Sequence, residues 1–273
     1  MCALVDDLRV CARLARPQSG RTMASSSCSP GVLLGELIVV GTVDTYKGYR
    51  YPIEVIGHAV WLYHRFALSL RDVEELMLAC GVVMTYETIR AWCAKFGPDY
   101  AKKLRQRRPR PGDKWHLDEM VVKINGRKQY LWRAVDQDGN ELDILVQSRR
   151  NGQAAKRFFK KLLKGLQYVP RVLVTDKLAS YGVAHRELMP SVTHRKSKFL
   201  NNRAENSHLH IRIREKVMKR FSSPGQAQRF LFSYGHIRQH FAHRRHLLSA
   251  AERREQLANS FTIWGEITAT AAA

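Results

Sequence analysis

The sequence predicts an α/β protein in which a mixed-sheet domain follows an all-α domain, and three observations lead there. Between residue 52 and about residue 97, apolar residues recur at helical spacing. After residue 113 the pattern changes to alternating segments rich in β-forming residues. A basic, proline-containing segment separates the two patterns. The 273 residues are 45 % hydrophobic and 26 % charged, which is a globular composition with enough chain for a buried core.

The charge balance indicates a polyanionic partner. Lysine and arginine number 46 against 24 aspartates and glutamates, giving a formal net charge of +22, and nucleic acid is the simplest partner for such an excess. The five cysteines include no C-x-x-C pair, so neither a disulfide framework nor a cysteine zinc site is expected. No apolar run reaches the length of a membrane span, and the N-terminus lacks a signal-peptide pattern. We therefore expect a cytoplasmic protein with no membrane partner.

Three helices are expected in the all-α part. Pro52 fits the first turn of the first helix. Ser69 is a candidate N-cap for a second helix that stops near Gly81. Thr85 is a candidate N-cap for a third helix, which the dipeptide Gly97-Pro98 is expected to end. Two short helices joined by a tight turn are typical of a helix-turn-helix, although an ordinary three-helix bundle fits the same pattern.

The third helix would be the one that reads DNA, with Tyr86, Arg90 and Lys95 directed outward. The basic segment that follows contains Arg105, Arg107 and Arg108, and it can track a phosphate backbone. Its alternative is a solvated connector between two domains, and both descriptions can hold together.

Three antiparallel strands open the second part of the chain. Residues 114–124 alternate, and Asn125-Gly126 is a strong two-residue hairpin turn. Residues 130–135 form the return strand, and residues 142–146 form a third strand after the turn Asp138-Gly139.

A helix capped by Asn151 comes next, followed by an apolar strand over residues 171–175 of the kind buried in a mixed or parallel sheet. A further helix, a brief strand near Val192 and a helix from about Asn202 complete the pattern. This order of elements is that of a ribonuclease-H-like fold.

Three acids occupy notable points of this order. Asp118 lies midway along the first strand, Asp176 ends the buried strand, and Glu205 lies in the first turn of a helix amid basic residues. Singly, each has a structural explanation: a polar residue of a strand, a helix cap, and a capping box with Asn202. Together they can converge on one spot, where carboxylates bind Mg²⁺ and two ions about 3.5–4 Å apart support phosphodiester chemistry.

These acids lie within longer motifs. The motifs are Trp115-x-Leu117-Asp118-Glu119, the run from Tyr130 to Asp136, Ser148-Arg149-Arg150, Thr175-Asp176-Lys177-x-x-Ser180-Tyr181, and His194-Arg195 followed by Asn201-Asn202-x-x-Glu205. In them, and from about Tyr46 to the end of the chain, the sequence resembles the transposases of the IS6 family of bacterial insertion sequences. That family belongs to the DDE group of transposases and retroviral-type integrases.

The resemblance implies a DNA transposase that cleaves and transfers strands at the ends of a mobile element. Its three acids match Asp118, Asp176 and Glu205, which would be catalytic and hold two Mg²⁺ ions, with Mn²⁺ as a substitute. The interval from Asp176 to Glu205 is somewhat shorter than in the family, through a loss near Met189-Pro190. The expected partners are element-end and target DNA and further copies of the chain, and the expected location is the bacterial cytoplasm, on the nucleoid.

Basic residues near the acids are expected to contact DNA. They are Arg149, Arg150, Lys177, His194, Arg195 and Arg203. In the C-terminal part, His236 and His240 have the spacing of a zinc pair. Their arginine neighbours favour instead a basic helix that faces DNA or a partner subunit.

The expected domains are a poorly ordered leader (1–44), a helix-turn-helix DNA-binding domain (45–100), a basic linker (101–112), a ribonuclease-H-like DDE catalytic domain (113–222) and a C-terminal helical extension (223–273). Two other functions stay open from the residues: a catalytically inactive helix-turn-helix regulator, and a ribonuclease-H-like nuclease acting on RNA–DNA hybrids.

Overall fold

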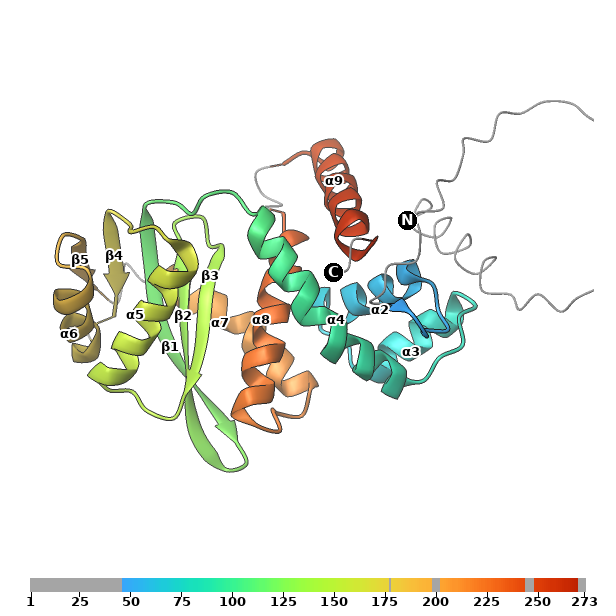
Figure 1. Ribbon diagram of the computed structural model, residues 1–273, viewed down its shortest axis with the longest axis horizontal. Helices are drawn as coiled ribbons and strands as arrows, with labels where there is room; N and C mark the ends of the chain where they lie inside the picture. Colours follow the sequence, from blue (N-terminus) through green and yellow to red (C-terminus); the bar gives the residue numbers. More distant parts are fainter. Residues whose placement is uncertain (1–45, 177, 198–201, 244–247, 270–273) are drawn as a thin grey trace, which may run out of the picture.

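The computed structural model describes residues 46–176, 178–197, 202–243 and 248–269, and of residues 202–207 the backbone alone (Figure 1). The leader expected over residues 1–44 lies outside this part. Within it, a group of helices packs beside a five-stranded sheet, and the last helices of the chain return to that group (Figure 1). No helix among the described residues is long and apolar enough to cross a membrane.

The first helices are α2 (Ile53–Arg65), α3 (Leu70–Ala79) and α4 (Tyr86–Arg107). Ser69 and Asp72 form a reciprocal capping box at the start of α3, and the Thr85 side chain accepts a hydrogen bond from the Thr88 amide at the start of α4. Both predicted caps are therefore confirmed. Pro52 lies one position earlier than expected, as the N-cap residue of α2.

The predicted end of the third helix at Gly97-Pro98 is wrong. Helix α4 continues through Pro98 to Arg107, so half of the expected basic linker is helical. Pro98 removes one backbone hydrogen bond. The helix persists because Phe96, Tyr100 and Leu104 continue one buried face across the proline.

The sheet contains β1 (Lys114–Ile124), β2 (Arg127–Asp136), β3 (Glu141–Gln147), β4 (Val172–Thr175) and β5 (Thr193–Lys196). The turn between β1 and β2 holds Asn125 and Gly126 at φ 49° and 75°, which is the left-handed pair that a two-residue hairpin requires. The strand order is β3-β2-β1-β4-β5, with β1–β3 antiparallel and β4 and β5 parallel to β1. This topology confirms the predicted ribonuclease-H-like fold.

Helices cover both faces of the sheet. On one face, α5 (Gly152–Leu166) and α6 (Ala179–Leu188) share a core with Trp115, Leu117 and Trp132. On the other, α7 (Asn202–Val217) and α8 (Pro224–His240) share a core with Met120 and Val122. Alternate residues of β1 therefore face different helix pairs.

The C-terminal helices join the helical group rather than standing apart. The end of α8 and helix α9 (Ala250–Ala269) contribute Ile237, Phe241, Trp264 and Ile267 to the core of α2–α4. His236 is buried, and His240 bonds the Ser260 carbonyl oxygen through Nε2 at 2.9 Å. His236 therefore packs inside the protein, and the expectation that it faces DNA or a partner is wrong, whereas His240 is half-buried and bonds α9 through Ser260.

Candidate active site

The sheet places Asp118 and Asp176 side by side. Strand β1 pairs in parallel with β4, and the last pair is Leu117 with Thr175. Each aspartate directly follows its member of that pair, so the two lie at the same level on neighbouring strands. The Asp176 side chain is 28 % exposed and also accepts a hydrogen bond from the Leu178 amide at 2.9 Å. This bond goes to the amide of Leu178, the N-cap residue of α6, so Asp176 does not itself cap that helix as expected.

A third acid joins them. Asp118, Glu119 and Asp176 each place one carboxylate oxygen within 4.8 Å of the others. Our sequence reasoning did not assign a role to Glu119. The signal that was available is its position directly after Asp118, within the motif that carries the family resemblance. Three carboxylates at this distance suit a hard divalent cation, since such ions prefer oxygen ligands.

The backbone of Glu205 lies in α7, and its side chain lies outside the described part. Helix α7 packs against β1 and β2. One turn beyond Glu205, His208 places Nδ1 3.6 Å from Oδ2 of Asp118. Burial lowers the pKa of His208 to about 4, so its ring is neutral at pH 7. The first turns of α7 thus lie on the same face of the sheet as Asp118.

Arg150 contacts two of the three acids. Its Nε donates to Oε1 of Glu119 at 2.6 Å, and its Nη2 lies 3.7 Å from Oδ2 of Asp176. Arg149 and Arg195 are exposed, whereas His194 bonds Oγ1 of Thr175 at 2.8 Å. The side chains of Lys177 and Arg203 lie outside the described part.

The expected reading helix presents its polar residues to solvent. Arg90 is exposed and pairs with Glu87 at 3.1 Å, with its guanidinium 5.5 Å from the centre of the Tyr86 ring. Lys95 is exposed, and its Nζ lies 4.6 Å from the centre of the Tyr49 ring. These three side chains are therefore available on one part of α4, away from the acids.

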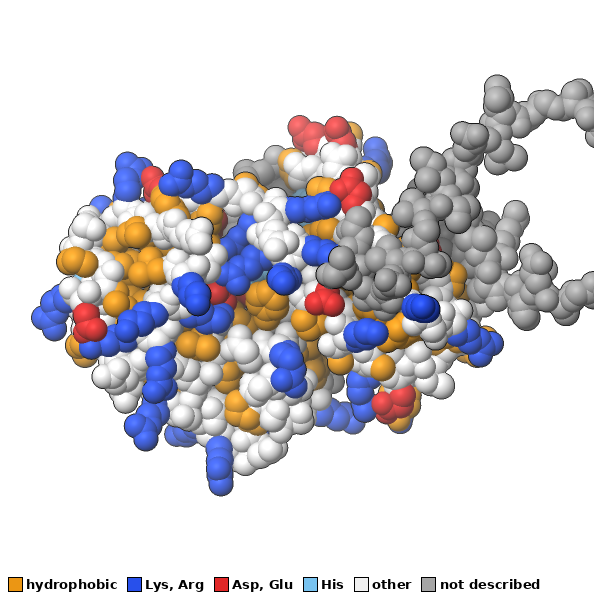
Figure 2. All heavy atoms as spheres, in the orientation of Figure 1, with side chains coloured by type: hydrophobic (Ala, Val, Ile, Leu, Met, Phe, Trp, Pro, Cys, Tyr) orange, Lys and Arg blue, Asp and Glu red, His pale blue; other side chains and the backbone are white. Residues whose placement is uncertain are grey.

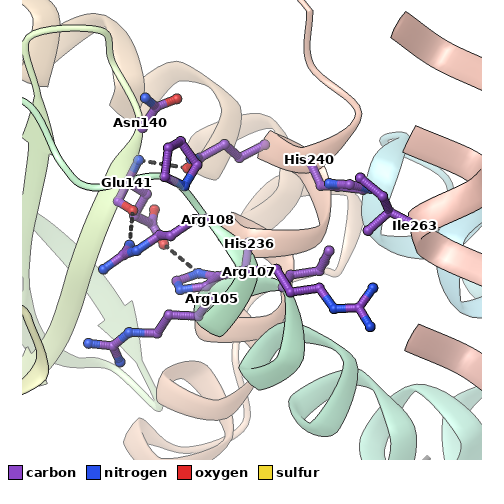
Figure 3. Close-up of a pocket in the computed structure, with 11 residues that line it drawn as sticks. Arg105, Arg107, Arg108, Asn140, Glu141, His236, His240 and Ile263 are labelled. Atoms are coloured by element: carbon purple, nitrogen blue, oxygen red, sulfur yellow. Dashed lines mark hydrogen bonds and ion pairs between the residues drawn. The ribbon is translucent and has the colours of Figure 1, made fainter. Parts of the chain in front are cut away.

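The arginines at the end of α4 behave differently from the sequence expectation. Arg105 pairs with Asp143 at 3.2 Å, and Arg108 donates to the carbonyl oxygens of Glu141 and Leu142. Arg107 pairs with Glu266 at 2.6 Å but keeps 45 % of its side chain exposed. Figure 3 shows the three arginines around a cavity of about 250 Å³ beside Glu141. Arg105 and Arg108 thus hold α4 against β3, and a phosphate contact would cost them these partners.

Known proteins resemble the part of the chain that holds the site. A family model described as a DDE domain, of the IS240 transposase type, matches residues 112–244. The transposase of insertion sequence element IS257 in transposon Tn4003 of Staphylococcus aureus is 34 % identical over 178 residues, which are 63 % of this chain and 79 % of that protein. The transposase of the IS431mec element from S. aureus Mu50 is 33 % identical over the same length.

Among solved structures, the catalytic core domain of HTLV-2 integrase in complex with magnesium aligns with 41 % of this chain and 86 % of its own, at 14 % identity and a TM-score of 0.30. A simian T-cell lymphotropic virus intasome aligns at 14 % identity and a TM-score of 0.32. The S. aureus relatives decide the assignment, because the identity extends over most of their length. This chain belongs to the DDE transposases of the IS6 family of insertion sequences.

Proposed function

We propose that this transposase binds the ends of a mobile DNA element and cleaves and transfers strands at Asp118, Asp176 and Glu205. One observation carries the proposal: Asp118 and Asp176 each directly follow the last residue pair between β1 and β4, and His208, one turn after Glu205 on α7, lies 3.6 Å from Asp118. Carboxylates beside the end of a parallel strand, in a chain with a net charge of +22, suit chemistry on a polyanion.

The donor set fits a divalent metal. Asp118 and Asp176 offer carboxylate oxygens within 4.8 Å of each other, and Glu205 would add a third ligand from α7. We propose two Mg²⁺ ions, with Mn²⁺ as a substitute, because phosphodiester transfer uses paired ions about 3.5–4 Å apart. When bound, such ions activate the attacking oxygen and neutralise the charge on the leaving oxygen.

The residues around the acids fix their geometry. Oδ1 of Asp118 accepts a hydrogen bond from the Glu119 amide at 2.9 Å, and the neutral ring of His208 borders its Oδ2. The Leu178 amide fixes Oδ1 of Asp176. Each aspartate thus has one oxygen held by a backbone amide. This arrangement orients ligands before substrate arrives.

DNA contacts are proposed on two surfaces. Tyr86, Arg90 and Lys95 on α4 would read the element end in a groove, as in a helix-turn-helix. Arg149 and Arg195, with Lys177, His194 and Arg203, would contact phosphates near the acids. In the segment 101–112, the exposed Lys102, Arg107 and Arg110 would contact phosphates. Arg105 and Arg108 are left out of this proposal, because both already bond groups within the protein.

The assembly and location follow from this role. A mobile element has two ends, and one chain carries one set of the three acids, so we propose a homo-oligomer on DNA. We also propose that it acts in the bacterial cytoplasm, on the nucleoid. Residues 45–100 and 113–222 would be the DNA-binding and catalytic domains. The segment 223–273 would connect them, since α8 packs on the sheet and α9 on the helical group.

Strand transfer by purified protein, on end DNA with Mg²⁺, tests the function. Asp118→Asn, Asp176→Asn and Glu205→Gln should each lower the rate of strand transfer by at least about 10³-fold. Each removes a proposed metal ligand, and the charge stabilisation that the ions supply is worth several kcal/mol. Binding to end DNA should stay near that of the wild type. Wild-type protein that binds but never cuts would instead identify an inactive regulator, and cleavage of RNA–DNA hybrids alone would identify a nuclease.

A further inference from the structure

Glu119 belongs to the acid cluster yet faces away from Asp118. Successive side chains of a strand point to opposite faces. Trp115 and Leu117 pack in the α5–α6 core, and Met120 and Val122 pack in the α7–α8 core. Glu119 therefore points toward α6, and Asp118 points toward α7. A carboxylate on the α6 side is unlike the three acids assigned to catalysis.

Both oxygens of Glu119 already have partners. Oε2 accepts a hydrogen bond from the Tyr181 hydroxyl at 2.7 Å, and Oε1 accepts from Nε and Nη2 of Arg150. The Glu119 side chain is 2 % exposed and Tyr181 is fully buried. These three donors use most of the acceptor capacity of the carboxylate. The contacts thus favour Glu119 as the group that holds Arg150.

Arg150 is fixed on one side and open on the other. One edge of its guanidinium bonds Glu119, while 43 % of the side chain is exposed. Nη2 lies 3.7 Å from Oδ2 of Asp176, which places the cation at the rim of the acid cluster. A planar guanidinium with free N–H groups matches the oxygens of a phosphodiester. Its fixation by a buried acid means that little conformational freedom is lost on binding.

We propose that Arg150 binds the phosphodiester that is cleaved and transferred, and that Glu119 and Tyr181 are its positioning residues. This inference rests on the proposed function and assigns roles that the three acids do not fill. It also gives residues from three of the motifs a common role. Glu119, Arg150 and Tyr181 come from separate segments that carry the family resemblance, and they meet in a single hydrogen-bonded group.

The first test asks whether Glu119 is a metal ligand, without measuring activity. The melting temperature of the full chain is followed during titration with MgCl₂ or MnCl₂, since a ligand that binds the folded state raises it. Glu119→Gln should keep the metal-induced shift of the wild type, whereas Asp176→Asn should lose most of it. Loss of the shift in Glu119→Gln would overturn the positioning role.

The second test uses single-turnover strand transfer on end DNA. Arg150→Gln should lower the rate about 10²–10³-fold, as for other fixed donors to a developing charge, and Glu119→Gln about 10–100-fold. The double variant should be no slower than Arg150→Gln within about threefold, because Glu119 acts through Arg150. Losses that multiply, or a wild-type rate in Arg150→Gln, would overturn the proposal.

Two controls keep the outcomes distinct. Lys156 forms an ion pair with Glu187 between α5 and α6, so Lys156→Gln removes an ion pair from the neighbouring helices and should leave the rate unchanged. Arg150 is half exposed, so Arg150→Gln is expected to fold, and circular dichroism checks this for each variant. Wild-type protein without strand transfer would refute the proposed function, whereas active wild type with fully active Arg150→Gln would refute this inference alone.

Discussion

Two groups of acids lie in the same sheet, and they differ in their ion-pair partners and in their exposure to solvent. Around Glu141 and Asp143, on β3, the acids are 3 % and 1 % exposed. Glu141 accepts a hydrogen bond from Nε of Arg133 at 2.8 Å, and Asp143 pairs with Arg105 and Lys161. In the second group, Arg150 forms ion pairs with Glu119 and Asp176, and the Asp176 side chain is 28 % exposed.

The difference distinguishes acids that hold parts of the fold together from acids of the candidate active site. Acids matched by cations and closed from water join β3 to β2, α4 and α5. Even a glycine serves this packing, since a Cβ on Gly235 would lie 2.0 Å from Oε1 of Glu141. A cluster in which one acid is open to solvent can admit a metal and a substrate. Exposure, not residue type, therefore distinguishes the candidate site.

The largest expected effect breaks the closed cluster. Glu141→Gln should lower the free energy of unfolding by about 3–5 kcal/mol, because removing one partner of a buried ion pair is strongly destabilising. Asp176→Asn should change it by no more than about 0.5–1 kcal/mol, since that acid is partly exposed and its neighbours are also acids. Urea denaturation of both variants measures the two values. Equal losses would remove the distinction between the clusters.

The next largest effect is a loss of stability at acid pH, which concerns the buried histidines near the closed cluster and in the helical core. His236 borders Glu141 and His64 lies between α2, α4 and α8, and burial lowers the pKa of each to about 3. Between pH 6.5 and about pH 3 the unfolded chain binds protons that these folded-state rings do not, so stability falls as pH falls. Each should cost about 2 kcal/mol at pH 5.

Denaturation at pH 7 and pH 5 measures this effect, and the variant His236→Gln provides its control. It should lose stability at pH 7 and show a smaller drop at pH 5 than the wild type. An unchanged drop would mean that His236 is not buried and neutral.

The smallest expected effects concern the cations of α4 and the segment after it. Replacing the exposed Lys102, Arg107 and Arg110 by glutamine should weaken binding to all DNA and flatten the salt dependence by about 0.9 per lost phosphate contact. Arg105→Gln should leave the salt dependence of binding unchanged, because Arg105 already forms an ion pair with Asp143. Binding to end DNA and scrambled DNA across a salt series provides the measurement.

Arg90→Ala completes this series as the sequence-reading variant. It should weaken binding to end DNA by about 1–3 kcal/mol and leave scrambled DNA nearly unaffected. An equal loss on both DNAs would turn α4 from a reader into a packing or dimerisation helix.

Local patterns predicted the elements well. Ser69, Thr85 and Asn151 cap helices as expected, and Asn125-Gly126 forms the hairpin, because caps and turns depend on residues a few positions apart. The strand order followed from the element order. Pro98 misled the prediction, since the local penalty of a proline is smaller than the gain from a buried face that extends to Leu104.

The sequence by itself determined the elements, their order and two acids of the candidate site, because Asp118 lies within one strand, and Asp176 directly after another, that the hydrophobic pattern already delimits. Only the tertiary structure decided which charges meet. Arg105 and Arg150 are alike in sequence, each within a basic run, yet one pairs with Asp143 and the other lies beside Asp176. Their partners are 38 and 26 residues away along the chain, and Glu119 is 31 from Arg150. Pairings at such separations depend on how strands and helices pack, which no local pattern encodes.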